Sequence, residues 1–169
     1  MTDARSRLLR VSDMPSDIGE TSELLRLNND HATELSFLTA DAMNRLVENS
    51  FMACRVGAAD AFVIAHDQDA DHDSLNYLWF RQRFPRFVYI DRIVVDPRRR
   101  GLGLARTLYE AVFAKAVEAA HDRVVCEVNI RPPNDASHAF HRMLGFEAVD
   151  SAVLPGGEKE VQYYSKRLP

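Results

Sequence analysis

Residues 87–117 constrain the fold more than any other stretch of the chain. They read FVYIDRIVVDPRRRGLGLARTLYEAVFAKAV. Residues 87–95 are apolar or β-branched apart from Asp91 and Arg92, as in a central strand that is covered on both faces. Apolar residues recur at helical spacing from Leu104 onward. The stretch therefore predicts a buried strand, a short basic loop and a helix, in that order.

The loop at residues 98–103 combines three arginines with two glycines. The first turn of a helix presents unpaired N–H groups and the positive end of its dipole, so such a turn favours an anion such as pyrophosphate. An ordinary basic surface turn is an equal alternative. A dinucleotide-binding fingerprint is excluded because Arg106 replaces its third glycine and only Asp122 is available as the later acid.

Two signatures resemble the GNAT superfamily of N-acetyltransferases. The first is Arg98-x-x-Gly101-x-Gly103 after Val-Val-Asp-Pro. The second combines a strand at 124–129, Asn134, and Phe-His-Arg-Met-Leu-Gly-Phe at 140–146, which is similar to the superfamily's F-Y-x-K-x-G-F. The resemblance implies a mixed, α+β-like α/β fold in one domain over residues 1–169. Its central mixed sheet would have six to seven strands, flanked by about four helices, with the fourth and fifth strands splayed apart.

The resemblance also implies acetyl-CoA as co-substrate and assigns its contacts by position. Backbone groups at the end of the fourth strand would bind pantetheine, and the loop amides would bind pyrophosphate. For Asn129 and Asn134, a strand-end or capping role is an equal alternative. The implied cofactor-binding set is Ile93, Val94, Val95, Arg98, Arg99, Arg100, Gly101, Leu102, Gly103, Leu104, Ala105, Arg106, Asn129, Asn134 and Phe140.

Acyl transfer to an amine needs a base, because an alkylamine with a pKa of about 10.4 is protonated near neutral pH. Asp91 and Glu127 are candidates, since each is an acid inside an apolar strand. A structural salt bridge is the alternative for both. A regular strand would point Arg92 away from Asp91, so Arg92 is not the expected partner. His141 stands where the superfamily commonly has a tyrosine assigned as general acid, and it is the candidate acid here.

Direct transfer in a ternary complex is expected in place of a route through Cys126. The neighbouring Glu127 would raise the pKa of the thiol and so reduce its nucleophilicity. The alternative from another class is a non-catalytic acyl-CoA-binding sensor or partner-binding module, which the missing tyrosine favours.

Aromatic residues gather between the acidic stretch and the central strand. Tyr77, Trp79 and Phe80 are candidate acceptor-binding residues, and packing in the core is an equal alternative. The polar segment at 28–38 lies where the superfamily varies to fit its acceptor. The expected acceptor is a small-molecule or peptide amine.

The stretch HDQDADHDS at 66–74 is rich in acids and histidines, yet no metal is expected. It has neither the glycine of a sharp calcium-loop turn nor the closing glutamate. A solvated polar loop is the favoured interpretation.

Charge and composition limit the remaining partners. The formal net charge of −4 argues against general nucleic-acid binding. No apolar run approaches membrane-spanning length, and the N-terminus lacks the apolar region of a signal peptide. Cys54 and Cys126 are expected as reduced core residues of a cytoplasmic protein. Whether the chain forms a homodimer is left open.

The remaining sequence predicts a short strand at 6–11, helices from about residue 16 and from residue 39, and a hairpin formed by 51–56 and 61–66. A helix is expected after Asn134, ending at Gly145, and two strands at 146–153 and 160–168 complete the chain.

Overall fold

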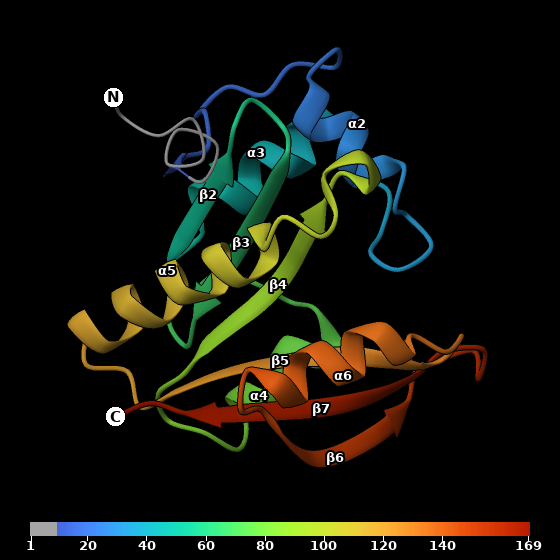
Figure 1. Cartoon of the computed structure of the whole chain (residues 1–169). Coiled ribbons are helices and arrows are strands. Elements are labelled where there is room, and N and C mark those ends of the chain that lie inside the picture. The colour runs from blue at the N-terminus through green and yellow to red at the C-terminus, as the bar shows by residue number, and fades with distance from the viewer. Residues whose placement is uncertain (1–9) are drawn as a thin grey trace.

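The protein is described by a computed structural model, in which the structure of residues 10–169 is described. One seven-stranded sheet runs through it in the order β1-β2-β3-β4-β5-β7-β6 (Figure 1). The mixed α/β fold predicted from the sequence is confirmed. The strands are β1 (Val11–Asp13), β2 (Met52–Val56), β3 (Ala61–Asp67), β4 (Val88–Val95), β5 (Arg123–Arg131), β6 (Glu147–Val153) and β7 (Glu160–Arg167).

Five α-helices lie within residues 10–169, together with the short 3₁₀ helix η1 (Pro97–Arg99). Side chains of Ser22, Thr39, Ser74 and Asn134 cap four of them by accepting a backbone N–H. The helices are α2 (Glu23–Asn29), α3 (Ala40–Glu48), α4 (Leu75–Arg81), α5 (Leu104–Glu118) and α6 (Asp135–Met143).

Two element boundaries differ from the sequence prediction, and one helix was not predicted. The first strand begins at Val11, so most of the predicted strand at 6–11 lies outside the described residues. The first described helix begins at Glu23 and not near residue 16. Helix α4 was not predicted, because its aromatic residues lie outside any clear periodic apolar pattern. No helix within residues 10–169 has both the length and the apolar character required to span a bilayer.

The helices cover both faces of the sheet. Helices α5 and α6 pack on one face, which we call the α5 face, against alternate residues such as Val63, Val88 and Val124. On the opposite face, α2 and α3 cover the half around β3, and α4 covers the half around β5 and β7. Figure 1 shows both helices on the near side of the sheet, with α5 in front of the upper strands and α6 in front of the lower strands.

Strands β4 and β5 are parallel but stay paired only at one end. Their Cα partners are Val88 with Val124 and Tyr89 with Val125, and no further pair follows. Figure 1 shows the two strands diverging beyond that point. The divergence implied by the resemblance is therefore confirmed, and it leaves unpaired backbone beside residues 90–95.

A β-bulge interrupts β4 at Asp91. Ile64 of β3 pairs with Arg92 while Ala65 pairs with Ile90, so Asp91 has no Cα partner on β3. The extra residue shifts the alternation of side chains. Arg92 therefore lies on the same side as Asp91. The expectation that these two side chains point to opposite faces was wrong because the strand is not regular.

Candidate active site

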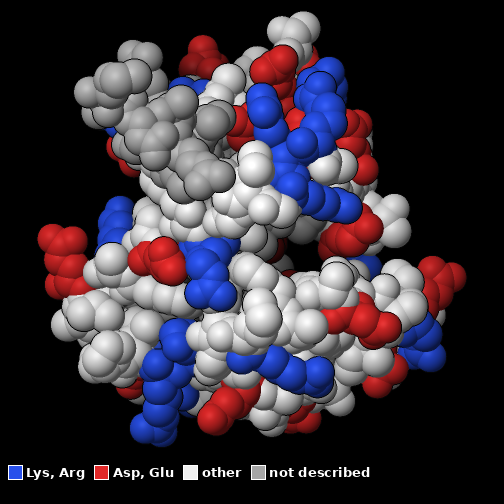
Figure 2. Space-filling model, viewed as in Figure 1, with Lys and Arg blue, Asp and Glu red and all other residues white. Residues whose placement is uncertain are grey.

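A cavity of about 310 Å³ lies where β4 and β5 diverge. Figure 2 shows the molecule hollowed between the part that carries α5 and the part that carries α6, with Lys and Arg side chains gathered above the hollow. The wall takes residues from both sides of the sheet. On the side opposite α5 these include Glu34, Ser36, Ser74, Asn76, Asp91 and Glu127, and on the α5 face Tyr109, Cys126, Ser137 and His141.

Asp91 is a buried carboxylate held by two partners. Arg92 donates a hydrogen bond from Nε to Oδ2 at 2.6 Å, and His72 Nε2 lies 2.9 Å from Oδ1. Burial alone would raise the pKa of Asp91, but the contacts with His72 and Arg92 outweigh it and hold the pKa well below its usual range. Asp91 is therefore a fixed negative charge at the cavity wall.

Arg92 connects this carboxylate to the segment between α2 and α3. Its Nη1 donates to Asn28 Oδ1 at 2.8 Å, and Nη2 lies 3.4 Å from Ser36 Oγ. Asn28 in turn donates to the Ser36 carbonyl oxygen at 2.9 Å. This network places residues 34–36 at the cavity, where the sequence led us to expect an acceptor-binding segment.

Glu127 on β5 is the second carboxylate, and its environment is the reverse of that of Asp91. The Tyr89 hydroxyl donates to Oε1 at 3.0 Å, and Oε2 is buried without a hydrogen-bond partner among residues 10–169. Burial raises the pKa of Glu127 to about 7. Two carboxylates in one cavity thus have pKa values displaced in opposite directions, as in sites that assign separate acid–base roles to a pair.

His141 and Tyr109 form a hydrogen-bonded pair on the α5 face. His141 Nδ1 lies 2.7 Å from the Ser137 carbonyl oxygen, which only accepts, so Nδ1 carries the proton. Nε2 then accepts from the Tyr109 hydroxyl at 2.6 Å. Burial lowers the pKa of His141. The imidazole is therefore neutral at pH 7, and its orientation is fixed from both ends.

The loop before α5 has the backbone geometry expected of an anion site. Gly101 and Gly103 have φ values of 81° and 77°, a region that disfavours residues with a Cβ. Gly103 is the N-cap of α5 and makes no side-chain cap, which leaves first-turn N–H groups open to a ligand. Arg98 and Arg99 are paired with Asp96 and Asp60, at 2.7 and 3.2 Å.

The cavity brings together a good part of the residues expected from the sequence. Asp91, Glu127 and His141 line it, and so do Ile93, Asn129 and Asn134 of the implied cofactor set. Asn134 also caps α6 by accepting from Ser137 N, so its capping role is present. The implied cofactor residues outside this wall are Val94, Val95, residues 98–106 and Phe140.

The three aromatic acceptor candidates do not line this cavity. Tyr77 and Phe80 are fully buried in a core cluster beneath α4, and Trp79 packs against that cluster. Trp79 stacks on Tyr163 with ring centroids 4.2 Å apart, and the Tyr163 hydroxyl donates to Asn76 Oδ1 at 2.9 Å. The core interpretation is the one that this packing supports, while Asn76 of the same segment reaches the cavity.

Sequence reasoning missed two tyrosines of the site. Tyr109 was hidden because it continues the apolar stripe of α5, and Tyr89 because it looked like one more residue of a buried strand. Each is at most 1% exposed, yet each hydroxyl bonds a polar group of the cavity wall. A useful signal was available, since a buried tyrosine needs a partner for its O–H.

Comparison with known families gives the class of protein. Residues 24–146 match the model described as "Acetyltransferase (GNAT) family". The chain therefore belongs to this family, whose members carry out acetyl-CoA-dependent acyl transfer. A search of curated protein sequences finds no significant match.

Solved structures of acetyltransferases share the fold. Ard1 from Thermoplasma volcanium has a TM-score of 0.73 at 16% identity, over 95% of this chain and 97% of that chain. Ribosomal-protein-alanine N-acetyltransferase from Brucella melitensis has a TM-score of 0.71 at 16% identity, over 95% and 100%. A NatB acetyltransferase complex bound to CoA and MES has a TM-score of 0.70 at 15% identity, over 95% of this chain and 99% of that chain. At these low sequence identities, the similarity to the solved structures shows a shared fold only.

Proposed function

We propose that this protein is an N-acetyltransferase that moves the acetyl group of acetyl-CoA directly to an amine in the cavity between β4 and β5. The observation that carries this proposal is the pair of buried carboxylates in the cavity wall. Asp91 is bonded to Arg92 and lies 2.9 Å from His72, whereas Glu127 Oε2 is buried without a hydrogen-bond partner among residues 10–169. Asp91 stays charged, whereas Glu127, with a pKa of about 7, exchanges a proton near neutral pH. A cavity that only stored acyl-CoA would have no need of such a base.

The proposed reaction takes place across the opening in the sheet. The acceptor enters from the side of Glu34, Asp91 and Glu127, and the thioester from the α5 face. Glu127 removes one proton from the ammonium group, and the freed nitrogen attacks the thioester carbonyl carbon. The tetrahedral intermediate then collapses, the C–S bond breaks and the nitrogen loses its second proton to solvent water. The products are the acetamide and the CoA thiolate.

The acidic wall favours a cationic acceptor, whether a small molecule or a peptide amine. Three carboxylates line the cavity against two cationic side chains, Lys159 and Arg92, and the guanidinium of Arg92 is already bonded to Asp91, Asn28 and Ser36. An ammonium group would therefore meet net negative charge.

Tyr109 is the proposed donor to the departing thiolate, and His141 positions its ring. The single O–H of Tyr109 donates to His141 Nε2 in the structure, so it must turn from Nε2 to the thiolate as the C–S bond breaks. Burial raises the pKa of Tyr109 well above 10, while a thiol has a pKa of about 8.5, so complete proton transfer would be unfavourable. A hydrogen bond to a charged group contributes about 1.5–3 kcal/mol, which corresponds to roughly ten- to a hundredfold in rate. Since Nε2 of neutral His141 is an acceptor, we assign His141 this positioning role in place of direct acid catalysis.

Transfer through Cys126 is not part of the proposal. Burial, and then the charge of Glu127, raise the pKa of this thiol well above its usual value, so it stays protonated. Direct transfer in a ternary complex requires no such nucleophile.

Acetyl-CoA consumption by the purified protein tests the proposal. We expect release of free thiol in the presence of a panel of cationic amines, and little release without an acceptor. Binding of acetyl-CoA without transfer to any amine across pH 6–9 would favour the non-catalytic sensor instead. A cytoplasmic location, a single domain over residues 1–169 and a homodimer stay predictions.

Replacing Gly103 by valine should weaken acetyl-CoA binding about tenfold or more. A β-branched residue is strained at a φ of 77°, although the space around Gly103 is open, so the damage should come from a displaced helix N-terminus. Isothermal titration with acetyl-CoA measures the effect. Gly19→Val, at another glycine with open space and an ordinary φ, is the matched control. Equal affinity of wild type and Gly103→Val for acetyl-CoA would show that this loop is not part of the cofactor site.

Tyr109→Phe and His141→Ala should each lower turnover roughly ten- to a hundredfold, with acetyl-CoA affinity little changed. The double variant should be no slower than the slower single variant, because residues that act as a unit are not additive. A Tyr109→Phe variant with wild-type turnover, beside a slow His141→Ala, would show that His141 acts without Tyr109.

A further inference from the structure

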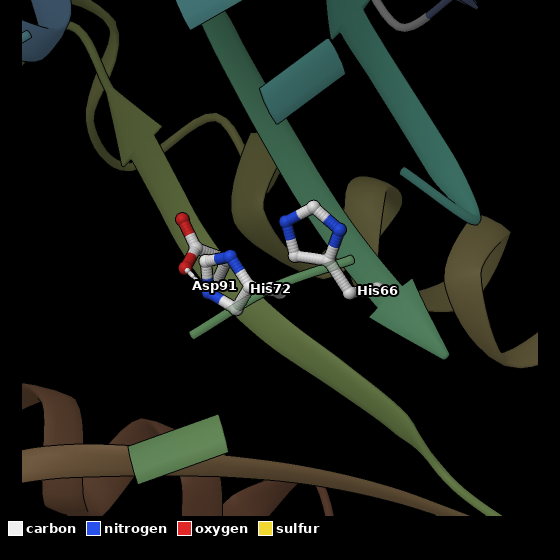
Figure 3. A group of neighbouring side chains, drawn as sticks. All are labelled: His66, His72 and Asp91. Atoms are coloured by element: carbon white, nitrogen blue, oxygen red, sulfur yellow. Dashed lines mark ion pairs between the residues drawn. The ribbon is translucent and has the colours of Figure 1, made fainter. Parts of the chain in front are cut away.

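Two histidines and Asp91 converge on the face of the sheet opposite α5, behind the cavity wall. His66 comes from β3, His72 from the acidic loop that follows it, and Asp91 from the bulge in β4. One ligand atom of each lies within 4.8 Å of the others. Figure 3 shows Asp91 and His72 side by side, with the His66 ring turned toward them. The three side chains come from different elements, so the fold and not the local sequence brings them together.

His66 presents a free lone pair at this point. It is fully buried, and Nδ1 lies 3.3 Å from the Asn49 carbonyl oxygen, an atom that can only accept. Nδ1 therefore carries the proton, and Nε2 is left unprotonated. Nε2 is buried without a hydrogen-bond partner among residues 10–169. A metal-binding histidine usually donates one ring N–H to a carbonyl oxygen and keeps a free lone pair on the other nitrogen.

His72 and Asp91 supply the other two donors. Their side chains are 10% and 5% exposed, and His72 Nε2 lies 2.9 Å from Asp91 Oδ1. His72 Nε2 is buried and makes no hydrogen bond among residues 10–169. Asp91 Oδ2 accepts from Arg92, which leaves Oδ1 as the oxygen that faces the histidines. Ligating carboxylates are commonly held in this way by an outer partner.

We propose that His66, His72 and Asp91 form a binding site for a divalent transition metal, with Zn²⁺ as the best-matched ion. Two imidazoles and one carboxylate are a common zinc set that leaves a fourth position open. Bonds of about 2.0 Å in a tetrahedron place ligand atoms about 3.3 Å apart. The His72–Asp91 pair, at 2.9 Å, must therefore open slightly, while any pair near the 4.8 Å limit must close. The imidazoles now stack at 4.4 Å with 21° between their planes. We expect the His72 ring to turn on binding, since the ion must lie near both ring planes.

Zinc binding at this site would affect the acceptor cavity. This expectation rests on the proposed function. Zn²⁺ would use the same Asp91 carboxylate that faces a cationic acceptor. Zinc is therefore expected to compete with the acceptor and to leave acetyl-CoA affinity unchanged. Binding itself can be measured without any acetyl transfer, so failure of the metal site and failure of the proposed function are distinguishable.

Titration of metal-stripped, untagged protein with ZnCl₂ at pH 7.5 tests the proposal by calorimetry and by melting temperature. We expect one equivalent to bind and the melting temperature to rise, with little effect of MgCl₂. His66→Gln and His72→Gln should each weaken Zn²⁺ binding at least tenfold. His31→Gln, at a histidine in the turn after α2 that contacts the Leu27 carbonyl oxygen, should bind like wild type.

Circular dichroism shows whether each variant is folded. His72→Gln lies in a loop and is informative even if His66→Gln fails to fold. The site is refuted if wild type shows no saturable Zn²⁺ binding. It is refuted equally if folded His72→Gln binds Zn²⁺ as tightly as wild type, because the ion would then be held elsewhere.

Discussion

Glu127→Gln is expected to lower turnover by about 10²–10⁴-fold, the range of a lost general base, while acetyl-CoA still binds normally. The glutamine keeps the shape of the side chain and can still accept the Tyr89 hydrogen bond, but it cannot take a proton from the acceptor. Steady-state kinetics with the best amine, together with titration of acetyl-CoA, measure the two effects separately. Glu147→Gln, at an exposed carboxylate of β6, is the matched control and should retain wild-type turnover.

The pH profile follows from the raised pKa of Glu127. A base with a pKa of about 7 is protonated and inactive below that value and ionised above it. Wild-type turnover should therefore rise through pH 6–8 and level off above. The residual activity of Glu127→Gln should lack this rise. A wild-type rate that is flat between pH 6 and 8 would contradict the assignment of Glu127 as the base.

The same substitution should stabilise the fold at alkaline pH. The pKa of Glu127 is raised from its usual 4.5 to about 7, so the folded state binds the proton more tightly than the unfolded state. Stability is then lost as pH rises through this window. At pH 8, Glu127→Gln should gain on the order of 1–3 kcal/mol over wild type, and at pH 5 much less. Urea unfolding at the two pH values measures the difference.

The sequence predicted those elements of the fold that have a local periodic pattern of apolar residues. The β4 strand, the basic loop and α5 are local patterns of apolar spacing and glycine placement, and all three are present. Helix α4 was missed because its aromatic residues show no clear helical repeat. The aromatic residues of this helix face a core that only the folded sheet creates.

The site was predictable where a polar residue contrasted with an apolar strand, as for Asp91 and Glu127. Its pairings were not predictable, because they depend on a bulge and on long-range contacts. The shifted register at Asp91 turned Arg92 into its partner, and Tyr109 meets His141 from a helix 32 residues away in sequence. Nothing in the spacing of the acidic loop indicated that His72 would reach β4.

Asp91→Asn is expected to destabilise the protein by about 3–5 kcal/mol, the usual effect of removing one partner from a buried ion pair. The guanidinium of Arg92 is on a residue that is 8% exposed, and it would keep its charge without the carboxylate that now lies 2.6 Å away. Urea unfolding at pH 7 measures this loss. Glu23→Gln breaks an exposed pair with Arg26 at 4.0 Å and should change stability by no more than about 1 kcal/mol.

The double variant Asp91→Asn/Arg92→Met separates the two contributions. It removes both buried charges, so it should be less destabilised than the sum of its single substitutions, by a coupling of about 0.5–3 kcal/mol. It also breaks the bonds from Arg92 to Asn28 and Ser36, so the KM for a cationic acceptor should rise even where the protein is folded. If Asp91→Asn were as stable as wild type with an unchanged KM, Asp91 would be neither the counterion of Arg92 nor a wall of the acceptor site.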